Sequence, residues 1–207
     1  MRTTPSRPFL PRTFMRRIAA LERALEQAQR LLHQDDLTAL LNRRGLRRVC
    51  DQWAVSPKTE ERMSCVMMDL DDFKSINDFH GHPVGDAALV HFSQVLHQHV
   101  RTTDVLARLG GDEFALLLLR ARDVDARSVV DRLQAEVTAS PLPIHGKLIS
   151  LRFSAGVAER QVDEPLSEAL ARADAALLES KRCNKILTSP LKNESLAKEF
   201  NSGILHA

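Results

Sequence analysis

The stretch DVLARLGGDEFALLLL, residues 104–119, is the part of the sequence that decides the fold. Two apolar segments, 104–109 and 113–119, flank the pair Gly110-Gly111, and glycine tolerates the positive φ angles of a tight turn. The pattern therefore predicts a β-hairpin with the two glycines at its turn. Because these glycines carry no side chain, they also leave room for a ligand to approach the backbone beside the acidic residues that follow.

A second apolar run, residues 63–70, is typical of a buried strand and ends in acidic residues. Asp69 and Asp71 lie two residues apart and so point to the same side of an extended chain. If this strand lies beside the hairpin, three or four carboxylates, including Asp112 and Glu113, converge at one edge of the sheet. Such crowding is costly unless a cation neutralises it, and oxygen ligands without histidine or cysteine favour Mg²⁺ or Mn²⁺. A surface hairpin whose acids serve only for solubility is the alternative.

Apolar spacing along the rest of the chain predicts alternating helices and strands. Helices are expected over residues 44–55, 72–79, 85–100, 124–138 and 166–182, and one or two strands within 147–159. Together with the strand and the hairpin above, this order predicts an α/β fold in which helices pack on one face of a mixed sheet.

The N-terminal region is expected to form an arm followed by a helix. Residues 1–13 hold three prolines without periodicity, which indicates a mobile arm. Residues 14–34 place apolar side chains at alternating steps of three and four, namely at Ile18, Leu21, Leu25, Ala28 and Leu32. Two interpretations are open: an amphipathic helix lying on its own domain, or a short dimerising stalk. The tail, residues 187–207, has no predicted structure.

Composition argues against several classes of protein. The 207 residues are 43% hydrophobic and 27% charged, and the net charge of +2 is too small to indicate a nucleic-acid or membrane surface. Apolar runs such as residues 115–119 are far short of the roughly 20 residues that cross a bilayer. Cys50, Cys65 and Cys183 are odd in number and far apart, so we expect buried thiols in a reducing cytoplasm rather than disulfides.

The residues after the acidic strand suit a nucleotide. The segment Asp71-Asp72-Phe73-Lys74 opens the next helix, where backbone N–H groups bind phosphate and the lysine adds a positive charge. Asn77 and Asp86 begin and end the segment Asn77-Asp78-x-x-Gly81-His82-x-x-Gly85-Asp86, and at this spacing they can read a guanine edge. Turn formation and helix capping are the alternative roles for such residues.

At these positions the sequence resembles the GGDEF family of diguanylate cyclases, over about residues 35–186. The motifs that carry the resemblance are Asp35-x-Leu37-Thr38-x-Leu40-x-Asn42-Arg43-Arg44, Asp69-x-Asp71-x-Phe73-Lys74-x-Ile76-Asn77-Asp78, Gly81-His82-x-x-Gly85-Asp86, Arg108-x-Gly110-Gly111-Asp112-Glu113-Phe114, Ser154-x-Gly156-Val157-Ala158 and Ala173-Asp174-x-Ala176-Leu177. The resemblance implies a palm-like α/β (α+β) fold, similar to nucleotide cyclases, with helices packed around a mixed sheet after an N-terminal helical stalk. It also implies that a homodimer, with one GTP per protomer, condenses two GTP into cyclic di-GMP and pyrophosphate.

The resemblance further implies roles for individual residues. Mg²⁺ (or Mn²⁺) would be held by Asp69, Asp112 and the carbonyl of Leu70. Either Asp112 or Glu113 would help deprotonate the attacking 3′-hydroxyl, and Lys74 would take part in catalysis. The GTP contacts would come from the guanine-reading residues and from the phosphate-binding or backbone-approach positions, namely Asn77, Asp86, Asp72, Phe73, Lys74, Gly110, Gly111, Lys181 and Lys185.

A product-inhibition site is also implied by the resemblance. It would consist of Arg101 and Asp104, in an R-x-x-D motif shortly before Gly110, together with Arg132 on the following helix. Arginine's planar fork suits the guanine edge and phosphates of a cyclic dinucleotide. A salt bridge at a helix end is the alternative role of so short a motif.

A few positions depart from the family pattern, namely Ala39, Leu109, Leu178 and the segment Asn184-Lys185-Ile186, which replaces a usual Gly-Arg-Asn ending. Asn184 can form the left-handed cap that ends a helix. Lys185 keeps a positive charge but loses arginine's two-point contact, so weaker phosphate binding is expected. The alternatives to an active cyclase are a module that only binds cyclic di-GMP and a mononucleotide cyclase that makes cyclic GMP. The N-terminal helix is a candidate contact for a regulatory protein.

Overall fold

A four-stranded sheet with the order β2-β3-β1-β6 forms the centre of the protein. The structure, a computed structural model, describes residues 12–54 and 62–188. The strands are β1 (Met63–Leu70), β2 (Val105–Gly110), β3 (Glu113–Leu119) and β6 (Phe153–Glu159), with a separate hairpin of β4 (Leu142–Ile144) and β5 (Lys147–Ile149). The helices are α1 (Arg12–His33), α2 (Arg43–Ala54), α3 (Phe73–His80), α4 (His82–His99), α5 (Asp123–Ala139) and α6 (Leu166–Thr188). Neighbouring strands in the sheet are antiparallel, and one parallel bridge joins Leu41 to Ala107.

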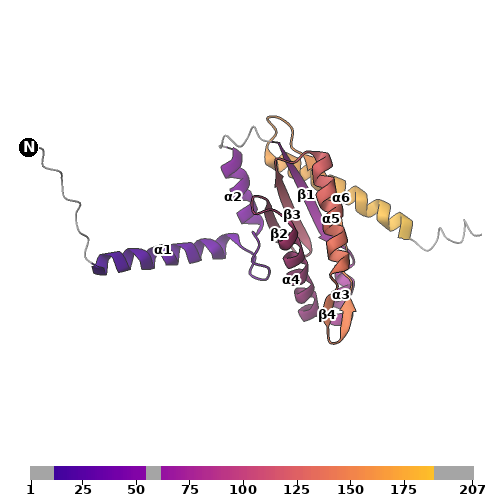
Figure 1. The fold of residues 1–207 in the computed structure, drawn as a ribbon, viewed down its shortest axis with the longest axis horizontal. Helices are drawn as coiled ribbons and strands as arrows, with labels where there is room; N and C mark the ends of the chain where they lie inside the picture. Colours follow the sequence, from indigo (N-terminus) through magenta and orange to yellow (C-terminus); the bar gives the residue numbers. More distant parts are fainter. Residues whose placement is uncertain (1–11, 55–61, 189–207) are drawn as a thin grey trace, which may run out of the picture.

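The central strand β1 pairs with β3 on one side and with β6 on the other. Figure 1 shows β1, β3 and β2 side by side. Its side chains alternate between the two faces of the sheet. Val66 and Met68 join a buried cluster with α4 and α5, whereas Cys65 and Met67 join a second cluster with α2 and α6. This double burial explains the nearly continuous apolar sequence of β1. Helices therefore cover both faces, and the expectation from element order that they would cover one face is wrong.

The expected elements are present with small shifts at their ends, and two differences have physical causes. The strand β4 was not among the expected elements, and it contains Pro143; proline is tolerated there because β4 is an edge strand that pairs with β5 alone in the described part of the chain. The last helix continues through Asn184 to Thr188, so the expected left-handed cap at Asn184 is wrong. Asparagine weakens a helix less than glycine does, and the helix can pass through this position.

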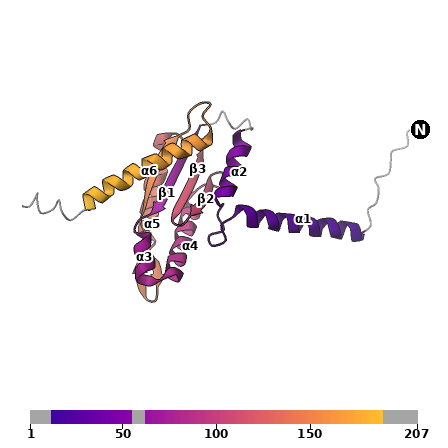
Figure 2. The ribbon, with the colours of Figure 1, turned by 180° about the vertical axis from the view of Figure 1, so that it is seen from behind.

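The helix α1 projects away from the sheet in both views of the molecule (Figures 1 and 2). Its apolar seam is largely exposed, and the side chain of Leu21 is 71% exposed. This geometry differs from that of an amphipathic helix lying on its own domain. The helix begins at Arg12, two residues before the expected start, and residues 1–11 of the expected arm lie outside the described residues, as does the tail beyond Thr188.

None of the helices in the two described ranges combines the length and the apolar content that a bilayer crossing needs. The two longest, α1 and α6, have 22 and 23 residues and carry charged side chains along their length. The structure thus agrees with the shortness of the apolar runs in the sequence.

Three phenylalanine rings join the hairpin to the helical layer. The ring of Phe92 on α4 lies 4.9 Å from that of Phe114 and 5.3 Å from that of Phe153, measured between centroids, and both pairs are edge to face. All three side chains are buried. Phe114 directly follows the acidic residues of the turn, and Phe153 begins β6. The cluster therefore holds in place the ends of two strands that border the acidic edge of the sheet.

We expect Phe92→Ala to lower the free energy of unfolding by about 3–5 kcal/mol, because it leaves a cavity between two aromatic rings. Urea titration followed by circular dichroism measures the change. The matched control is Phe79→Ala on α3, where the side chain is 83% exposed. The control should change stability by no more than about 0.5 kcal/mol. Equal effects of the two substitutions would contradict this description of the core.

Candidate functional site

An open cleft of about 810 Å³ lies at the edge of the sheet where β1 ends and β6 begins. The side chains and backbone that line it are those of Asp69, Leu70, Asp71, Asp72, Phe73, Lys74, Asp112, Gln134, Thr138, Arg152, Phe153, Ser154 and Lys181. Most of the residues assigned from the sequence to metal and phosphate binding are therefore together. The others do not line the cleft, namely Asn77, Asp86, Gly110, Gly111 and Glu113, and the side chain of Lys185 lies outside the described residues.

The antiparallel register of β1 and β3 sets the relation between the acidic residues. Asp69 is the register partner of Glu113, the first residue of β3. The N–H of Leu70 donates to the carbonyl oxygen of Asp112 at 3.3 Å. On its other side, Asp69 is the register partner of Ser154 on β6. Asp69 therefore lies between the hairpin turn and the start of β6, and it shares the cleft with Asp112.

Asp69 is a largely buried carboxylate whose counter-ion is a lysine. The Nζ atom of Lys181 on α6 lies 2.5 Å from Asp69 Oδ1, and the two side chains are 37% and 14% exposed. Burial raises the pKa of the Asp69 carboxyl; the Lys181 ammonium opposes this shift, while the carboxylates of Asp112 and Glu113 add to it, and the pKa remains raised. The surroundings of Asp69 therefore favour the approach of positive charge.

The acidic residues of the two strands come to one edge of the sheet, where Asp69, Asp71, Asp72 and Asp112 line the cleft. The described residues nevertheless contain no group of three or more histidine, cysteine, aspartate or glutamate side chains that could hold a metal ion together. Asp71 accepts a hydrogen bond from the Ser154 hydroxyl at 2.7 Å, and Glu113 pairs with Arg43 at 3.4 Å. Asp69 and Asp112 are left as candidate ligands, and they fit Mg²⁺, which binds through one or two carboxylates together with substrate phosphates and water.

The start of α3 brings unpaired backbone N–H groups to the cleft. Asp72, the residue before the helix, has a φ of 56°, and its side chain makes no capping hydrogen bond. The first N–H groups of a helix have no partner within the helix, so those of Phe73 and Lys74 are suitable donors to phosphate oxygens.

Asn77 and Asp86 lie on the paired helices α3 and α4. A Cβ atom at Gly85 would collide with Oδ1 of Asn77, so the absence of a side chain at Gly85 is what leaves space for the Asn77 amide. The N–H of Gly81, between the two helices, donates to the carbonyl of Asn77 at 2.8 Å. The sequence analysis named Gly85 only as part of a motif, and the structure adds a steric role for it.

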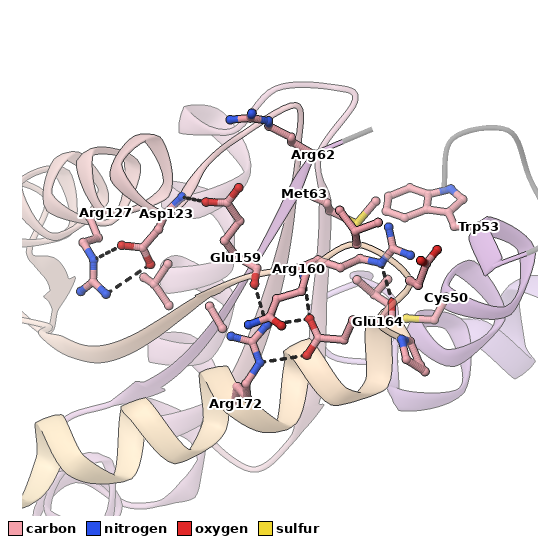
Figure 3. A pocket seen from close by; sticks show the side chains of 17 residues that line it. Cys50, Trp53, Arg62, Met63, Asp123, Arg127, Glu159, Arg160, Glu164 and Arg172 are labelled. Carbon is pink, nitrogen blue, oxygen red and sulfur yellow. Dashed lines mark hydrogen bonds and ion pairs between the residues drawn. The ribbon is translucent and has the colours of Figure 1, made fainter. Parts of the chain in front are cut away.

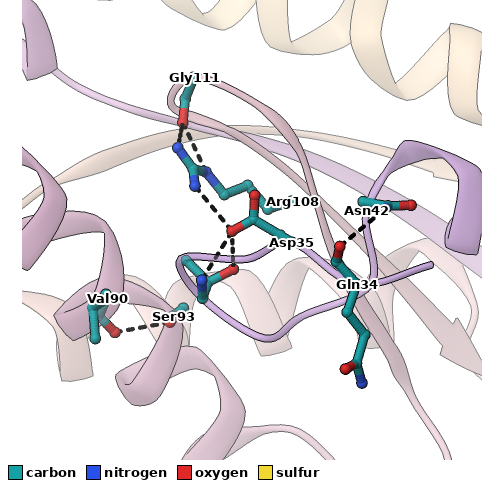
Figure 4. A network of polar contacts seen from close by, with 8 residues as sticks. Gln34, Asp35, Asn42, Val90, Ser93, Arg108 and Gly111 are labelled. Carbon is teal, nitrogen blue, oxygen red and sulfur yellow. Dashed lines mark hydrogen bonds and ion pairs between the residues drawn. The ribbon is translucent and has the colours of Figure 1, made fainter. Parts of the chain in front are cut away.

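A charged network holds the glycine turn (Figure 4). The Nε and Nη2 atoms of Arg108 donate to the carbonyl oxygen of Gly111 at 3.0 and 2.8 Å, and Nη1 contacts Asp35 Oδ1 at 2.9 Å. Asp35 lies just after α1 and also accepts hydrogen bonds from the N–H and the hydroxyl of Thr38. The network ties the end of α1 to the hairpin turn. Sequence reasoning assigned no role to Arg108, although the motif that marks the turn begins with it.

Arg101, Asp104 and Arg132 lie on neighbouring elements, at the connection from α4 to β2 and on α5. Asp104 Oδ2 accepts a hydrogen bond from the N–H of Arg101 at 3.0 Å, whereas Oδ1 of Asp104 is buried and has no hydrogen-bond partner among the described residues. Arg132 Nη2 donates to the carbonyl of His99 at 2.8 Å, at the end of α4. A buried carboxylate oxygen without a partner is rare, and it indicates a place for a donor from outside the chain.

A larger cavity, of about 1240 Å³, lies at the opposite end of β1 and β6 (Figure 3). Its charged side chains include close ion pairs, with 2.7 Å between Arg172 and Glu164 and 2.6 Å between Arg127 and Asp123. Such pairs are already neutralised and need no ligand for charge balance. We therefore place the candidate site in the smaller cleft, which Asp69 and Asp112 both line and where Lys181 pairs with Asp69.

The fold and the acidic cleft define a palm-like α+β domain of the nucleotide-cyclase type. Residues 32–185 match the family described as "Diguanylate cyclase, GGDEF domain". The chain therefore belongs to the GGDEF family, as the sequence motifs indicated.

Relatives of known name agree with this assignment. Diguanylate cyclase A of Treponema denticola is 34% identical over 139 residues, which cover 67% of this chain and 38% of that protein. The coiled coil and GGDEF domain of DgcB from Caulobacter crescentus, solved in complex with c-di-GMP, superposes with a TM-score of 0.75 at 28% identity, covering 82% of this chain and 91% of that one. The diguanylate cyclase SiaD from Pseudomonas aeruginosa, solved with its activator SiaC, superposes with a TM-score of 0.68 at 32% identity. The match covers 83% of this chain and 70% of the SiaD chain. The chain spans only 20% to 40% of the length of the curated relatives it matches.

We expect Asp35→Asn to destabilise the fold at neutral pH by about 1–3 kcal/mol, because the Arg108 guanidinium loses its charged partner. The Arg108 side chain is only 11% exposed, so water replaces that partner poorly. Urea unfolding of both proteins measures the difference.

The difference should also depend on pH. Burial by itself raises the pKa of Asp35, but hydrogen bonds from Thr38, and then from Arg108, outweigh it and hold the pKa below its ordinary value. A carboxyl with a lowered pKa contributes stability above its unfolded pKa, and this stability is lost as the pH falls through the folded pKa. The gap between wild type and Asp35→Asn should therefore shrink towards about pH 3. A gap that stays constant down to that pH would show that the ion pair is not its cause.

Proposed function

We propose that the protein is a Mg²⁺-dependent diguanylate cyclase that condenses two GTP molecules into cyclic di-GMP and releases pyrophosphate. The observation that carries the proposal is the single cleft lined by Asp69, Asp112, Lys74 and Lys181. Paired carboxylates suit a cation that bridges phosphates, and lysines beside a helix start suit phosphate oxygens. Relatives that are named diguanylate cyclases support the same reaction.

The residues of the cleft divide into metal-binding and phosphate-binding groups in this proposal. Asp69, Asp112 and the carbonyl of Leu70 would hold Mg²⁺ or Mn²⁺, which neutralises phosphate charge and activates a hydroxyl when bound. Lys74 and Lys181, with the N–H groups at the start of α3, orient the triphosphate. Holding the reacting groups in one geometry removes much of the entropic barrier to their reaction.

The remaining residues would contact the guanine base, the 3′-hydroxyl proton and the phosphates of the nucleotide. Asn77 and Asp86 would read the guanine edge, and either Asp112 or Glu113 would accept the proton of the attacking 3′-hydroxyl. The side-chain-free turn at Gly110-Gly111 gives a nucleotide access to the backbone, since a Cβ at either glycine would meet nothing within 4 Å. Lys185, four residues after Lys181 in the sequence, would be a further phosphate contact.

Two protomers must meet before either 3′-hydroxyl reaches the phosphorus of the other GTP, and we assign this meeting to α1. The helix projects from the sheet with its seam exposed. With Ile18 at a core position of a parallel pair, Arg17 of one helix faces Glu22 of the other, and their charges are complementary. The seam covers only about two heptads, so the association should be weak and concentration-dependent.

The setting that we propose is the cytoplasm, with a regulatory protein as a further partner of α1. The thiols of Cys50 and Cys65 are free in the structure, as a reducing compartment requires. SiaD, a structural relative, was solved with an activator protein. Exposed apolar residues near the start of α1, Phe14 and Met15, offer such a protein a contact.

Product inhibition would act through Arg101, Asp104 and Arg132. The unpaired Oδ1 atom of Asp104 suits the N–H donors of a guanine edge, and the arginines suit the same base and the phosphates. DgcB, a structural relative, was solved with c-di-GMP. A receptor that binds cyclic di-GMP without making it is the second candidate, because these three residues are present while the usual ending of the last helix is altered.

Purified protein supplied with Mg²⁺ and GTP is expected to yield cyclic di-GMP, identified by chromatography. Asp112→Asn should lower the rate by about 100-fold or more, because the cation would lose one of its two charged ligands. Asp51→Asn, at an exposed position of α2, is the matched control and should keep the wild-type rate. Turnover per protomer should rise with protein concentration because the reaction needs a dimer.

Other outcomes of this assay identify the alternatives. Absence of product at high protein concentration, with cyclic di-GMP still bound, would favour the receptor. Cyclic GMP as the product would favour a mononucleotide cyclase.

Arg101→Ala is expected to relieve product inhibition without lowering the initial rate, because it removes one arginine from a site apart from the cleft. The half-inhibitory concentration of added cyclic di-GMP should rise by about tenfold or more, the loss of a charged hydrogen bond of about 1.5–3 kcal/mol. Arg127→Ala, on the same helix as Arg132 but paired with Asp123, is the control. Inhibition that persists unchanged in Arg101→Ala would overturn the assignment of this site.

A further inference from the structure

We infer that the ammonium of Lys181 neutralises Asp69 until ligands enter the cleft. It must leave Asp69 and pair with the triphosphate before a divalent cation can bind Asp69. The inference rests on the proposed function for the identity of the ligands. It adds a competition between a side chain and the metal at one carboxylate, and it predicts an order of binding.

The contact between Lys181 and Asp69 is close and well shielded. The Nζ atom lies 2.5 Å from Asp69 Oδ1, and only 14% of the aspartate side chain is exposed. A charge-assisted hydrogen bond of this kind is stronger than one at the open surface, because less water competes for the two groups. The lysine is anchored on α6, which packs against β1 and β6. Asp69 therefore meets the ammonium of Lys181 before it can meet a metal ion.

Lys181 differs in this respect from the other cations of the same cleft. Lys74 and Arg152 also line it, but neither is bonded or ion-paired to Asp69 among the interactions of the described residues. Only Lys181 therefore occupies a coordination position of the carboxylate that the metal would need. Lys74, on α3, is a cation of the same type that lines the same cleft, and it provides a natural comparison.

The competition has a consequence for the order of binding. A divalent cation that binds without nucleotide must displace the Lys181 ammonium from Asp69. The ammonium then lies unpaired beside the cation, and the repulsion between these two positive charges costs electrostatic energy. A nucleotide that arrives with the cation supplies phosphate oxygens as new partners for Lys181, so its charge is paired again. The cation should therefore bind weakly to the protein alone and tightly together with the triphosphate. The lysine thus favours occupation of the cleft by the metal–nucleotide complex over the metal alone.

The test compares Lys181→Met with Lys74→Met in two binding measurements on the full chain. Mn²⁺ binding without nucleotide is measured by electron paramagnetic resonance of the free ion, and binding of a non-hydrolysable GTP analogue with Mg²⁺ is measured by calorimetry. Lys181→Met should bind Mn²⁺ about five- to tenfold more tightly than wild type and bind the analogue about tenfold more weakly. Lys74→Met should weaken the analogue similarly and leave Mn²⁺ binding unchanged.

In Lys181→Met, Mn²⁺ binding should become tighter while binding of the GTP analogue becomes weaker. A salt bridge with only a structural role would not change the two affinities in opposite directions. Mn²⁺ affinity that is unchanged or reduced in Lys181→Met would overturn the inference. Lys181→Gln is the second variant: it keeps a hydrogen-bonding side chain of similar length, so it should fold even if the methionine variant does not, and the same rise in Mn²⁺ affinity is expected. The readout does not depend on turnover. Wild type without cyclase activity would refute the proposed function, yet tighter Mn²⁺ binding in the variants would still support the exchange.

Discussion

The antiparallel pairing of β1 with β3 is the constraint on which the rest of the site depends. It sets Asp69 opposite Glu113 and brings the carbonyl of Asp112 to the N–H of Leu70. A shift of this register by one residue would turn the side chains of one strand to the other face of the sheet. The buried faces of β1 prevent such a shift, because each face already packs in its own core cluster. The packing of the core therefore also fixes the positions of the carboxylates.

The glycine turn is held from two directions. The aromatic contacts of Phe114 with Phe92 fix the strand below the turn, and the Arg108 guanidinium fixes the carbonyl of Gly111. Glycines without close neighbours would otherwise leave the turn with many conformations. Because Arg108 also binds Asp35, a change in the position of α1 relative to the domain acts on a group that contacts the turn. This geometry offers a direct physical route from the stalk to the cleft.

Much of the architecture follows from local patterns in the sequence. The hairpin at Gly110-Gly111 and the strand over residues 63–70 were expected where they occur, because apolar runs and turn glycines act over a few residues. The strand β4 was not among the expected elements; it contains Pro143, which argues against a strand unless the strand lies at an edge, and edges are known only from the assembled sheet. The extension of α6 through Asn184 was missed because a left-handed cap and a helical continuation are both open to asparagine.

The sequence by itself determined the elements, the glycine turn and the acidic residues at the strand ends, because each depends on neighbours along the chain. Only the tertiary structure decided that helices cover both faces, that Asp71 is bonded to Ser154 within the cleft, and that Lys181 is the partner of Asp69. These facts depend on contacts between residues far apart in the chain. Periodicity and spacing carry no information about which distant side chain arrives at a carboxylate, because that is settled by how helices pack on a twisted sheet.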